Sequence, residues 1–140
     1  MFKRKSPAIV LIDDDPFALA LTAKVVGHLM NKKHIRTFTS AKDAIAHLRA
    51  GVGVRQPGQA VPGLILSDLN MPGMDGFGFL DEFAKLSPAI CDRYKLYILS
   101  ATRDEGEQRK LFEKICFAGF CPKPLTVEKL QQILKETGHR

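Results

Sequence analysis

Short apolar runs alternate with amphipathic helical patterns along this chain, and the alternation limits the folds open to it. Short strands are expected at 8–12, 35–38, 64–67, 96–99 and 117–121, and most of them are apolar runs. Strands of this kind are typical of a parallel sheet that is buried on both faces. Between the runs, apolar residues recur at the three- and four-residue spacing of a helix face. The sequence therefore predicts an α/β protein, a doubly wound five-stranded parallel sheet with helices on both faces.

Length and composition narrow the class of protein further. A chain of 140 residues fits one domain, expected to cover about residues 6–138. No apolar run approaches the ~20 residues of a membrane span, and the apolar stretch after the basic segment 1–7 is too short for a signal peptide. We therefore expect a cytoplasmic protein. The net charge of +6 comes from scattered lysines and arginines without a separate basic arm, so neither a membrane nor nucleic acid is expected as a direct partner.

The three cysteines do not suggest a metal site or a disulfide framework. Cys91, Cys116 and Cys121 form an odd set without a Cys-x-x-Cys pair. Structural zinc sites depend on such pairs, and disulfide frameworks belong mainly to secreted domains. We expect reduced cysteines that pack in the protein interior.

Residues with charged or hydroxyl side chains follow the ends of the predicted strands. Asp13 and Asp14 follow the first run, Asp68 the third and Ser100 the fourth, while Lys123 follows the fifth. In an open parallel sheet these carboxyl ends meet at one edge, which is where such sheets bind ligands. Together they offer a nucleophilic carboxylate, an acidic metal pocket, a hydroxyl and a cation. These are the parts that phosphoryl transfer needs.

Four segments resemble the signatures of the receiver domain of two-component response regulators. They are Leu-Ile-Asp-Asp-Asp-Pro at 11–16, Ser-Asp-Leu-Asn-Met-Pro-Gly-Met-Asp-Gly at 67–76, Leu-Ser-Ala at 99–101 and Cys-Pro-Lys-Pro at 121–124. They occur in the family's order, and the resemblance spans about residues 6–138. It implies a flavodoxin-like fold and a stand-alone, CheY-like receiver. Such a protein is a phosphorylation switch without its own output domain.

The resemblance also implies roles for the acidic residues. Asp68 would be the phosphoacceptor, taking a phosphoryl group from the phosphohistidine of a histidine kinase or a histidine phosphotransfer protein. Mg²⁺ or Mn²⁺ would be bound by Asp14 and Asp68 directly, by Asp13 through water, and by the backbone carbonyl of Asn70. The protein would then be a self-phosphorylating acceptor, able to lose its phosphoryl group slowly, and not an enzyme acting on separate substrates.

The hydroxyl and the cation receive roles from the same resemblance. Ser100 would donate a hydrogen bond to a phosphoryl oxygen once Asp68 is modified. Lys123 would pair with Asp68 at rest and with the phosphoryl group afterwards, stabilising the charge that develops there. The bond from Lys123 to Pro124 is expected to be cis.

In the family, phosphorylation is transmitted through the hydroxyl and an aromatic residue. Here Ser100 would move toward the phosphate and Phe120 would swing inward. The affected face would comprise residues 103–114, 117–121 and 125–135, which could bind a downstream partner or a second copy in a homodimer. Phe120 stands where Tyr is common and lacks its hydroxyl, so an ordinary core aromatic is the alternative interpretation.

Several residues are assigned to structure rather than chemistry. Asp15 precedes Pro16 and is expected to cap the first helix. In the loop after Asp68, Pro72 fixes φ, and Gly73 and Gly76 permit positive φ. The Gly- and Pro-rich connector 51–63 is expected to be a tolerated surface insertion rather than a partner loop. Thr102 would border the water approach to the phosphate, with no direction assigned to its effect.

Two other functions are alternatives to the phosphorylation switch. A phosphatase of the Asp-x-Asp type needs a first-strand nucleophile and a second carboxylate two residues later, but Asp68 lies on the third strand and Asn70 follows it. A receiver-like binding module that takes no phosphate would not need the acidic residues, Ser100 and Lys123 to be intact. The phosphorylation switch therefore remains the leading interpretation.

Overall fold

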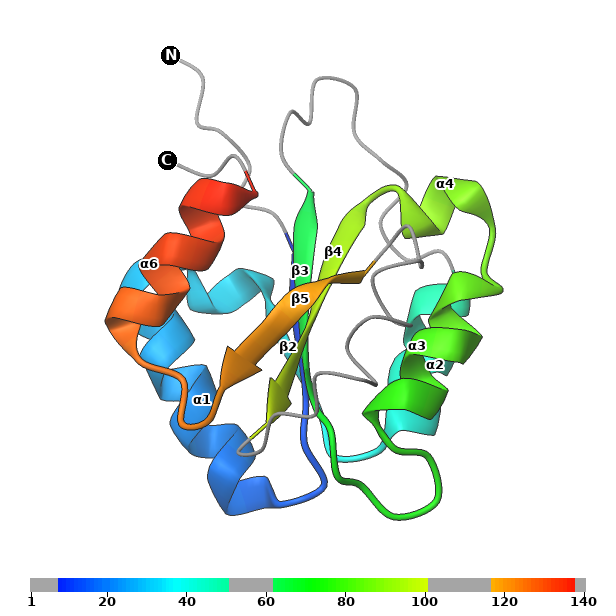
Figure 1. Cartoon of the computed structure of the whole chain (residues 1–140), viewed down its shortest axis with the longest axis horizontal. Coiled ribbons are helices and arrows are strands. Elements are labelled where there is room, and N and C mark those ends of the chain that lie inside the picture. The colour runs from blue at the N-terminus through cyan, green and yellow to red at the C-terminus, as the bar shows by residue number, and fades with distance from the viewer. Residues whose placement is uncertain (1–7, 51–61, 101–116, 138–140) are drawn as a thin grey trace.

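A five-stranded parallel sheet lies between helices on its two faces (Figure 1). The computed structural model describes residues 8–50, 62–100 and 117–137. The strands are β1 (Ile9–Ile12), β2 (Ile35–Phe38), β3 (Gly63–Asp68), β4 (Tyr94–Ser100) and β5 (Phe117–Pro122). The helices are α1 (Pro16–Leu29), α2 (Ala41–Arg49), α3 (Gly76–Ala84), α4 (Pro88–Cys91) and α6 (Val127–Glu136), with a 3-10 turn at Lys32–His34.

The strand order is β2-β1-β3-β4-β5, and the paired strands are parallel. This confirms the predicted doubly wound α/β architecture. The order reverses between β1 and β3, because the chain adds β2 on one side of β1 and the later strands on the other. A crevice at such a reversal is the usual ligand site of doubly wound sheets.

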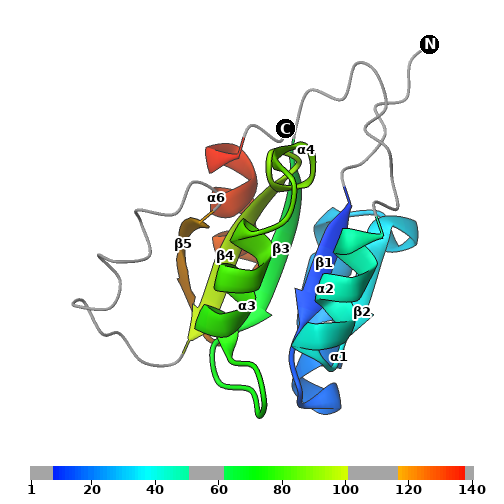
Figure 2. The same ribbon diagram turned by 90° about the vertical axis from the view of Figure 1, so that its right-hand side faces the viewer.

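Two apolar cores, one on each face of the sheet, hold the helices in place. On one face, α2 and α3 pack on residues that include Val10, Ile65 and Ile98; on the other, α1 and α6 pack on Leu11 and Leu66. Successive strand residues alternate between the two cores, as side chains in a strand must. Figure 2 shows α2 and α3 in front of the sheet. Burial on both faces explains why β1 and most of β3 are apolar, whereas the edge strand β2 contains the exposed Arg36 and Thr37.

The strands extend beyond the apolar runs that predict them. β4 begins at Tyr94, because Tyr94 and Lys95 continue the parallel register against Gly63 and Leu64 of β3. The short helix α4 was not predicted; Pro88 stands at its first turn, where the missing N–H costs nothing. The predicted helix carrying Leu111, the segment 103–114, Thr102 and most of the connector 51–63 lie outside the described residues.

A β-bulge in β5 changes which side chains share a face. The register steps from Leu96–Phe117 to Tyr97–Gly119, so Ala118 is an extra residue, and Gly119 has a φ of 155°. Residues three apart in a regular strand point to opposite faces. Because of the bulge, Phe117 and Phe120 instead lie on the same face, with ring centroids 5.2 Å apart in an edge-to-face arrangement. The spacing of the sequence alone would have separated them.

Tyr97 links β4 to the last helix. Its hydroxyl donates a hydrogen bond to the Glu136 carboxylate at 3.2 Å. Burial of the ring, together with the Glu136 charge, raises the pKa of Tyr97 from its ordinary value of 10.0 to about 12. The folded protein therefore keeps this proton at pH values where the unfolded chain has lost it.

Alkaline pH should weaken this link. Between pH 10 and 12 the unfolded chain binds fewer protons than the folded one, so stability falls as pH rises. Because Glu136 is exposed and screened, we expect the advantage of wild type over Tyr97→Phe to shrink by about 1 kcal/mol across that window. Urea unfolding at pH 8, 10, 11 and 12 measures it. An advantage that stays constant across the series would contradict the assignment.

Candidate functional site

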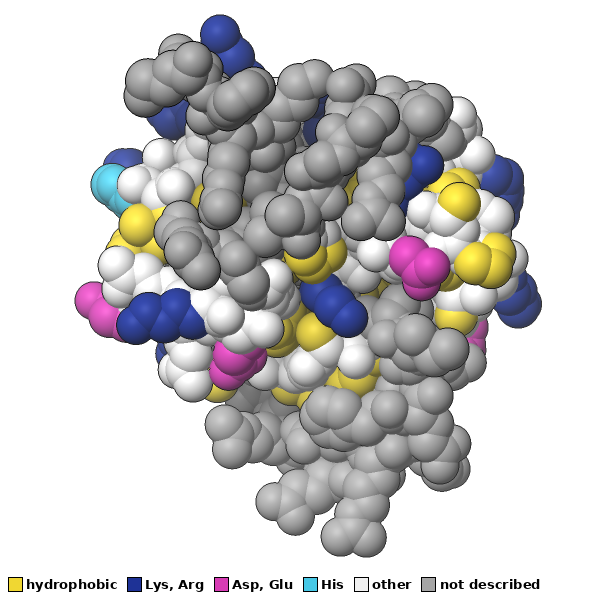
Figure 3. All heavy atoms as spheres, turned by 90° about the horizontal axis from the view of Figure 1, so that it is seen from above, with side chains coloured by type: hydrophobic (Ala, Val, Ile, Leu, Met, Phe, Trp, Pro, Cys, Tyr) yellow, Lys and Arg dark blue, Asp and Glu magenta, His cyan; other side chains and the backbone are white. Residues whose placement is uncertain are grey.

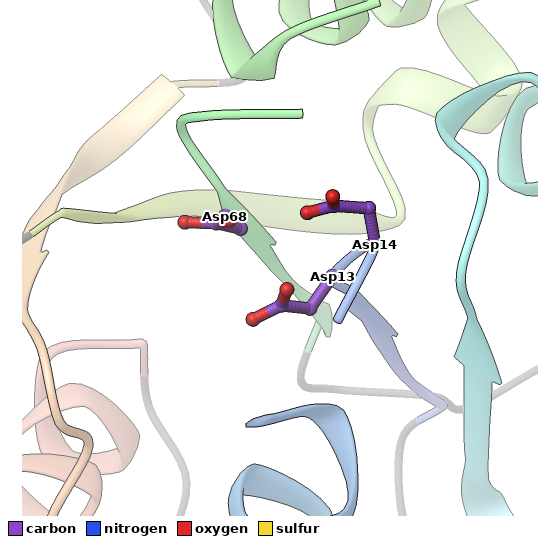
Figure 4. A group of neighbouring side chains, drawn as sticks. All are labelled: Asp13, Asp14 and Asp68. Carbon is purple, nitrogen blue, oxygen red and sulfur yellow. The ribbon is translucent and has the colours of Figure 1, made fainter. Parts of the chain in front are cut away.

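Three carboxylates meet at the point where the strand order reverses. Asp13 and Asp14 follow β1, and Asp68 ends β3 (Figure 4). One oxygen from each carboxylate lies within 4.8 Å of the others. Asp13 and Asp68 are only 5% and 6% exposed, whereas Asp14 is open to solvent. The sequence prediction that these strand ends converge is confirmed.

Hydrogen bonds in the turn between β1 and α1 orient the side chains that follow β1. The Asp15 side chain accepts a hydrogen bond from the Phe17 N–H at 2.9 Å and caps α1, as predicted. The Asp13 carboxylate accepts one from the Asp15 N–H at 3.0 Å. The turn between β1 and α1 therefore assigns Asp15 to the helix and leaves Asp13 and Asp14 on the crevice.

Lys123 supplies the cation of the site. Its Nζ lies 2.7 Å from Oδ1 of Asp68 and 3.4 Å from Oδ2 of Asp13. Partial burial acts to lower the pKa of this ammonium, but the hydrogen bond and charge of Asp68, with Asp13, outweigh it and raise the pKa. Lys123 is thus charged at neutral pH. The Lys123–Pro124 bond is cis, as predicted.

Ser100 ends β4 beside these groups. It is 6% exposed, and its backbone carbonyl accepts a hydrogen bond from the Lys123 N–H at 3.1 Å. That bond carries the β4–β5 pairing past its last registered pair, Ser100 with Pro122. It therefore ties the hydroxyl-bearing residue to the lysine-bearing loop.

One positive charge against three carboxylates leaves the cluster with excess negative charge. Like charges this close repel one another, and two of the three are nearly shielded from water. Carboxylate oxygens are the ligands that small divalent cations such as Mg²⁺ prefer. The donor set therefore fits a hard divalent ion.

Comparisons with known proteins agree with this geometry. The sequence profile of the family described as "Response regulator receiver domain" matches residues 9–135. The chain belongs to this family. The comparison with curated proteins finds no match.

Solved structures of receiver proteins resemble this receiver domain over nearly its whole length. A response regulator receiver protein from Dyadobacter fermentans is 28% identical with a TM-score of 0.78, covering 96% of this chain and 100% of its own. A two component response regulator from Cytophaga hutchinsonii is 26% identical with a TM-score of 0.78, over 96% and 98%. A CheY-like receiver protein from Methanospirillum hungatei, 19% identical with a TM-score of 0.70 over 94% of each chain, shares the flavodoxin-like fold.

The loop after Asp68 leads into α3. Gly73 has a φ of 83°, as predicted, but Gly76 does not have a positive φ. Gly76 is needed for another reason, since a Cβ there would lie 2.9 Å from the backbone oxygen of Asp68. Asn70 is exposed in this loop, and metal coordination by its backbone carbonyl stays a prediction.

Phe120 lies on β5, packed partly against the core under α2 and α3. Its contact with Phe117 would be made by an ordinary core aromatic and equally by a switch residue that moves on phosphorylation. The role of Phe120 as a switch therefore stays a prediction. Much of the face that would respond to it, residues 103–114, lies outside the described residues.

An apolar cleft of about 630 Å³ adjoins the receiver site. It runs between α1 and the loop after β5, and its lining includes Leu21, Val25, Lys123, Pro124 and Leu125. Leu21 and Phe17 are unusually exposed for large apolar residues, at 52% and 73%. This side of α1 is therefore apolar and exposed to solvent next to Lys123.

Among the described residues, charged side chains at the opposite end of the sheet do not gather into one cluster. Figure 3 views it from above, and on its coloured surface basic, acidic and apolar side chains are interspersed. The positive net charge is therefore not gathered into one basic patch on the described part of this view.

Among the described helices, none is long and apolar enough to cross a bilayer.

Sequence reasoning missed one polar residue near the acceptor. Ser67 is fully buried in β3, and its hydroxyl donates a hydrogen bond to the backbone carbonyl of Asp68 at 3.0 Å. The available signal was a serine inside an otherwise apolar strand, directly before the key aspartate.

Proposed function

We propose that Asp68 is the phosphoacceptor of a two-component switch, modified by the phosphohistidine of a histidine kinase or a histidine phosphotransfer protein. One observation carries the proposal. Asp68 lies in a cluster of three carboxylates whose oxygens are within 4.8 Å, and it pairs with Lys123 at 2.7 Å. A structural capping aspartate would need neither the acidic neighbours nor the lysine.

A divalent cation completes the proposed site. Asp13, Asp14 and Asp68, with the backbone carbonyl of Asn70, would hold Mg²⁺ or Mn²⁺. Such an ion neutralises charge on the phosphoryl oxygens, which otherwise repel an attacking carboxylate. The chain supplies the remaining parts of the reaction from its own side chains.

The proposed transfer forms one bond and breaks one. A carboxylate oxygen of Asp68 attacks the phosphorus, the bond from phosphorus to the donor imidazole nitrogen breaks, and an aspartyl phosphate results. Lys123 already holds the attacking group, and its flexible stem lets the ammonium follow the new charge. The Ser100 hydroxyl would donate to a phosphoryl oxygen. The exposed side of α1, with its cleft beside Lys123, would admit the donor.

Phosphorylation adds charge and hydrogen-bond acceptors at Asp68. We propose that Ser100 and Phe120 convert this local change into a rearrangement of β5 and α6. A downstream protein or a second copy would then bind that face. Phe117 would move with Phe120, because their rings are in contact at 5.2 Å between centroids.

Intact-mass spectrometry after incubation with acetyl phosphate tests the proposal. The expected result is a gain of one phosphoryl group with Mg²⁺ present and none with excess chelator. Mg²⁺ binding is measured separately by calorimetry. Bound Mg²⁺ without any mass gain would contradict the proposed acceptor role.

A further inference from the structure

Ser67 is a buried polar residue in the most buried part of the sheet. It is 0% exposed, and its sheet neighbours in register are Ile12 of β1 and Ile98 of β4. A hydroxyl removed from water here needs a hydrogen-bond partner, whereas an apolar side chain would not. The identity of its partner therefore indicates what the hydroxyl does.

That partner is the backbone carbonyl of Asp68, at 3.0 Å. On the β1 side the strand register ends at the pair Ile12–Ser67, and the residue that follows β1, Asp13, bonds through its N–H to the Phe38 carbonyl of β2. On the other side, the Leu69 N–H still bonds to the Leu99 carbonyl of β4 at 3.1 Å. The Ser67 hydroxyl thus donates its hydrogen bond to a backbone carbonyl at the point where pairing with β1 has ended and the loop after Asp68 begins.

The same carbonyl lies against the start of α3. A Cβ on Gly76 would come within 2.9 Å of it, and the Gly76 N–H bonds to the Leu69 carbonyl at 2.8 Å. The loop carrying Asn70 is therefore closed onto the peptide that follows Asp68. Any rotation of that peptide would change the orientation of the Asp68 carboxylate and of the loop that follows it.

We propose that Ser67 is a positioning residue for the phosphoacceptor. Its hydroxyl fixes the peptide between Asp68 and Leu69, and so sets how the Asp68 carboxylate and the Asn70 carbonyl are presented to the cation. The inference rests on the proposed function of Asp68. Groups that orient metal ligands from behind typically affect metal affinity or rate by about 10–100-fold.

A matched pair of variants isolates the hydroxyl. Ser67→Thr and Ser67→Val have the same shape and differ only in having a hydroxyl or a methyl group. Ser67→Ala removes the hydroxyl without adding volume, and Ile65→Val is the packing control, since Ile65 is fully buried in the same strand and on the same face as the α2–α3 core. Two readouts are measured: Mn²⁺ affinity by electron paramagnetic resonance, and the maximal rate and half-saturating concentration for acetyl phosphate.

Loss of the hydroxyl should weaken Mn²⁺ binding and lower the maximal rate, each by about tenfold, in both Ser67→Ala and Ser67→Val. Ser67→Thr should stay within about threefold of wild type, and Ile65→Val should match wild type. Equal Mn²⁺ affinities for the Thr and Val variants would overturn the inference. If wild type binds Mn²⁺ but takes no phosphoryl group, the proposed acceptor role fails, and the affinity comparison alone decides the role of Ser67.

Discussion

Asp68→Asn should take up no phosphoryl group while keeping the fold. The amide has nearly the shape of the carboxylate, so the core around β3 is not disturbed, but it cannot form an acyl phosphate under the same conditions. The change also removes one of three carboxylates whose oxygens lie within 4.8 Å. The folded state therefore loses some like-charge repulsion together with its ion pair to Lys123.

Intact mass after incubation with acetyl phosphate and Mg²⁺ measures this loss. Asp75→Asn is the matched control, because Asp75 lies in the same loop and caps α3 through the Gly78 N–H at 2.8 Å. Asparagine caps helices about as well as aspartate, so this variant should be modified like wild type. Equal phosphorylation of Asp68→Asn and wild type would show that Asp68 is not the phosphoacceptor.

Lys123→Ala should separate metal binding from phosphoryl transfer. Removing the ammonium takes away a positive charge that lies 2.7 Å from Asp68 and 3.4 Å from Asp13. The carboxylates then have no resident cation competing with the metal, so Mn²⁺ affinity should be kept or increased. The maximal transfer rate should fall by about 10²-fold, the usual effect of losing one group that stabilises charge in a transition state. We also expect this variant to fail to propagate the switch.

Lys129→Ala is the control for this prediction. Lys129 lies on α6, and its Nζ donates a hydrogen bond to the Pro124 carbonyl at 3.4 Å without an ion pair to the cluster. Both variants lose one lysine charge near the same loop. Stopped-flow kinetics with acetyl phosphate and Mn²⁺ titration provide the two readouts. A Lys123→Ala protein with the transfer rate of the Lys129→Ala control would rule out the proposed role of Lys123.

The fold can be predicted from the sequence because strands that are buried on both faces are apolar at successive positions. Apolar runs and helical spacing are local patterns. The parallel sheet could therefore be predicted from them, together with the end of the sheet where Asp13, Asp68 and Lys123 meet. Their distances could not, since they depend on strand register and on the turn between β1 and α1. The ion pair of Lys123 with Asp68 was expected from family resemblance and is confirmed at 2.7 Å.

The features that sequence reasoning missed depend on contacts across the sheet. The bulge at Ala118 appears only when β5 is aligned with β4, and it places Phe117 beside Phe120. Gly76 was explained by backbone freedom, but it is needed because the Asp68 carbonyl lies so close. Ser67 looked like part of a family motif, and its hydrogen bond behind the acceptor is a three-dimensional fact.

Chemical mapping of the modified residue tests the assignment of Asp68 as the acceptor. Wild type is incubated with Mg²⁺ and acetyl phosphate, reduced with borohydride, digested and sequenced by mass spectrometry. Borohydride reduces an aspartyl phosphate to homoserine, so homoserine is expected at position 68 and nowhere else. Homoserine in place of another aspartate, or a phosphoryl group that resists reduction, would show that Asp68 is not the acceptor.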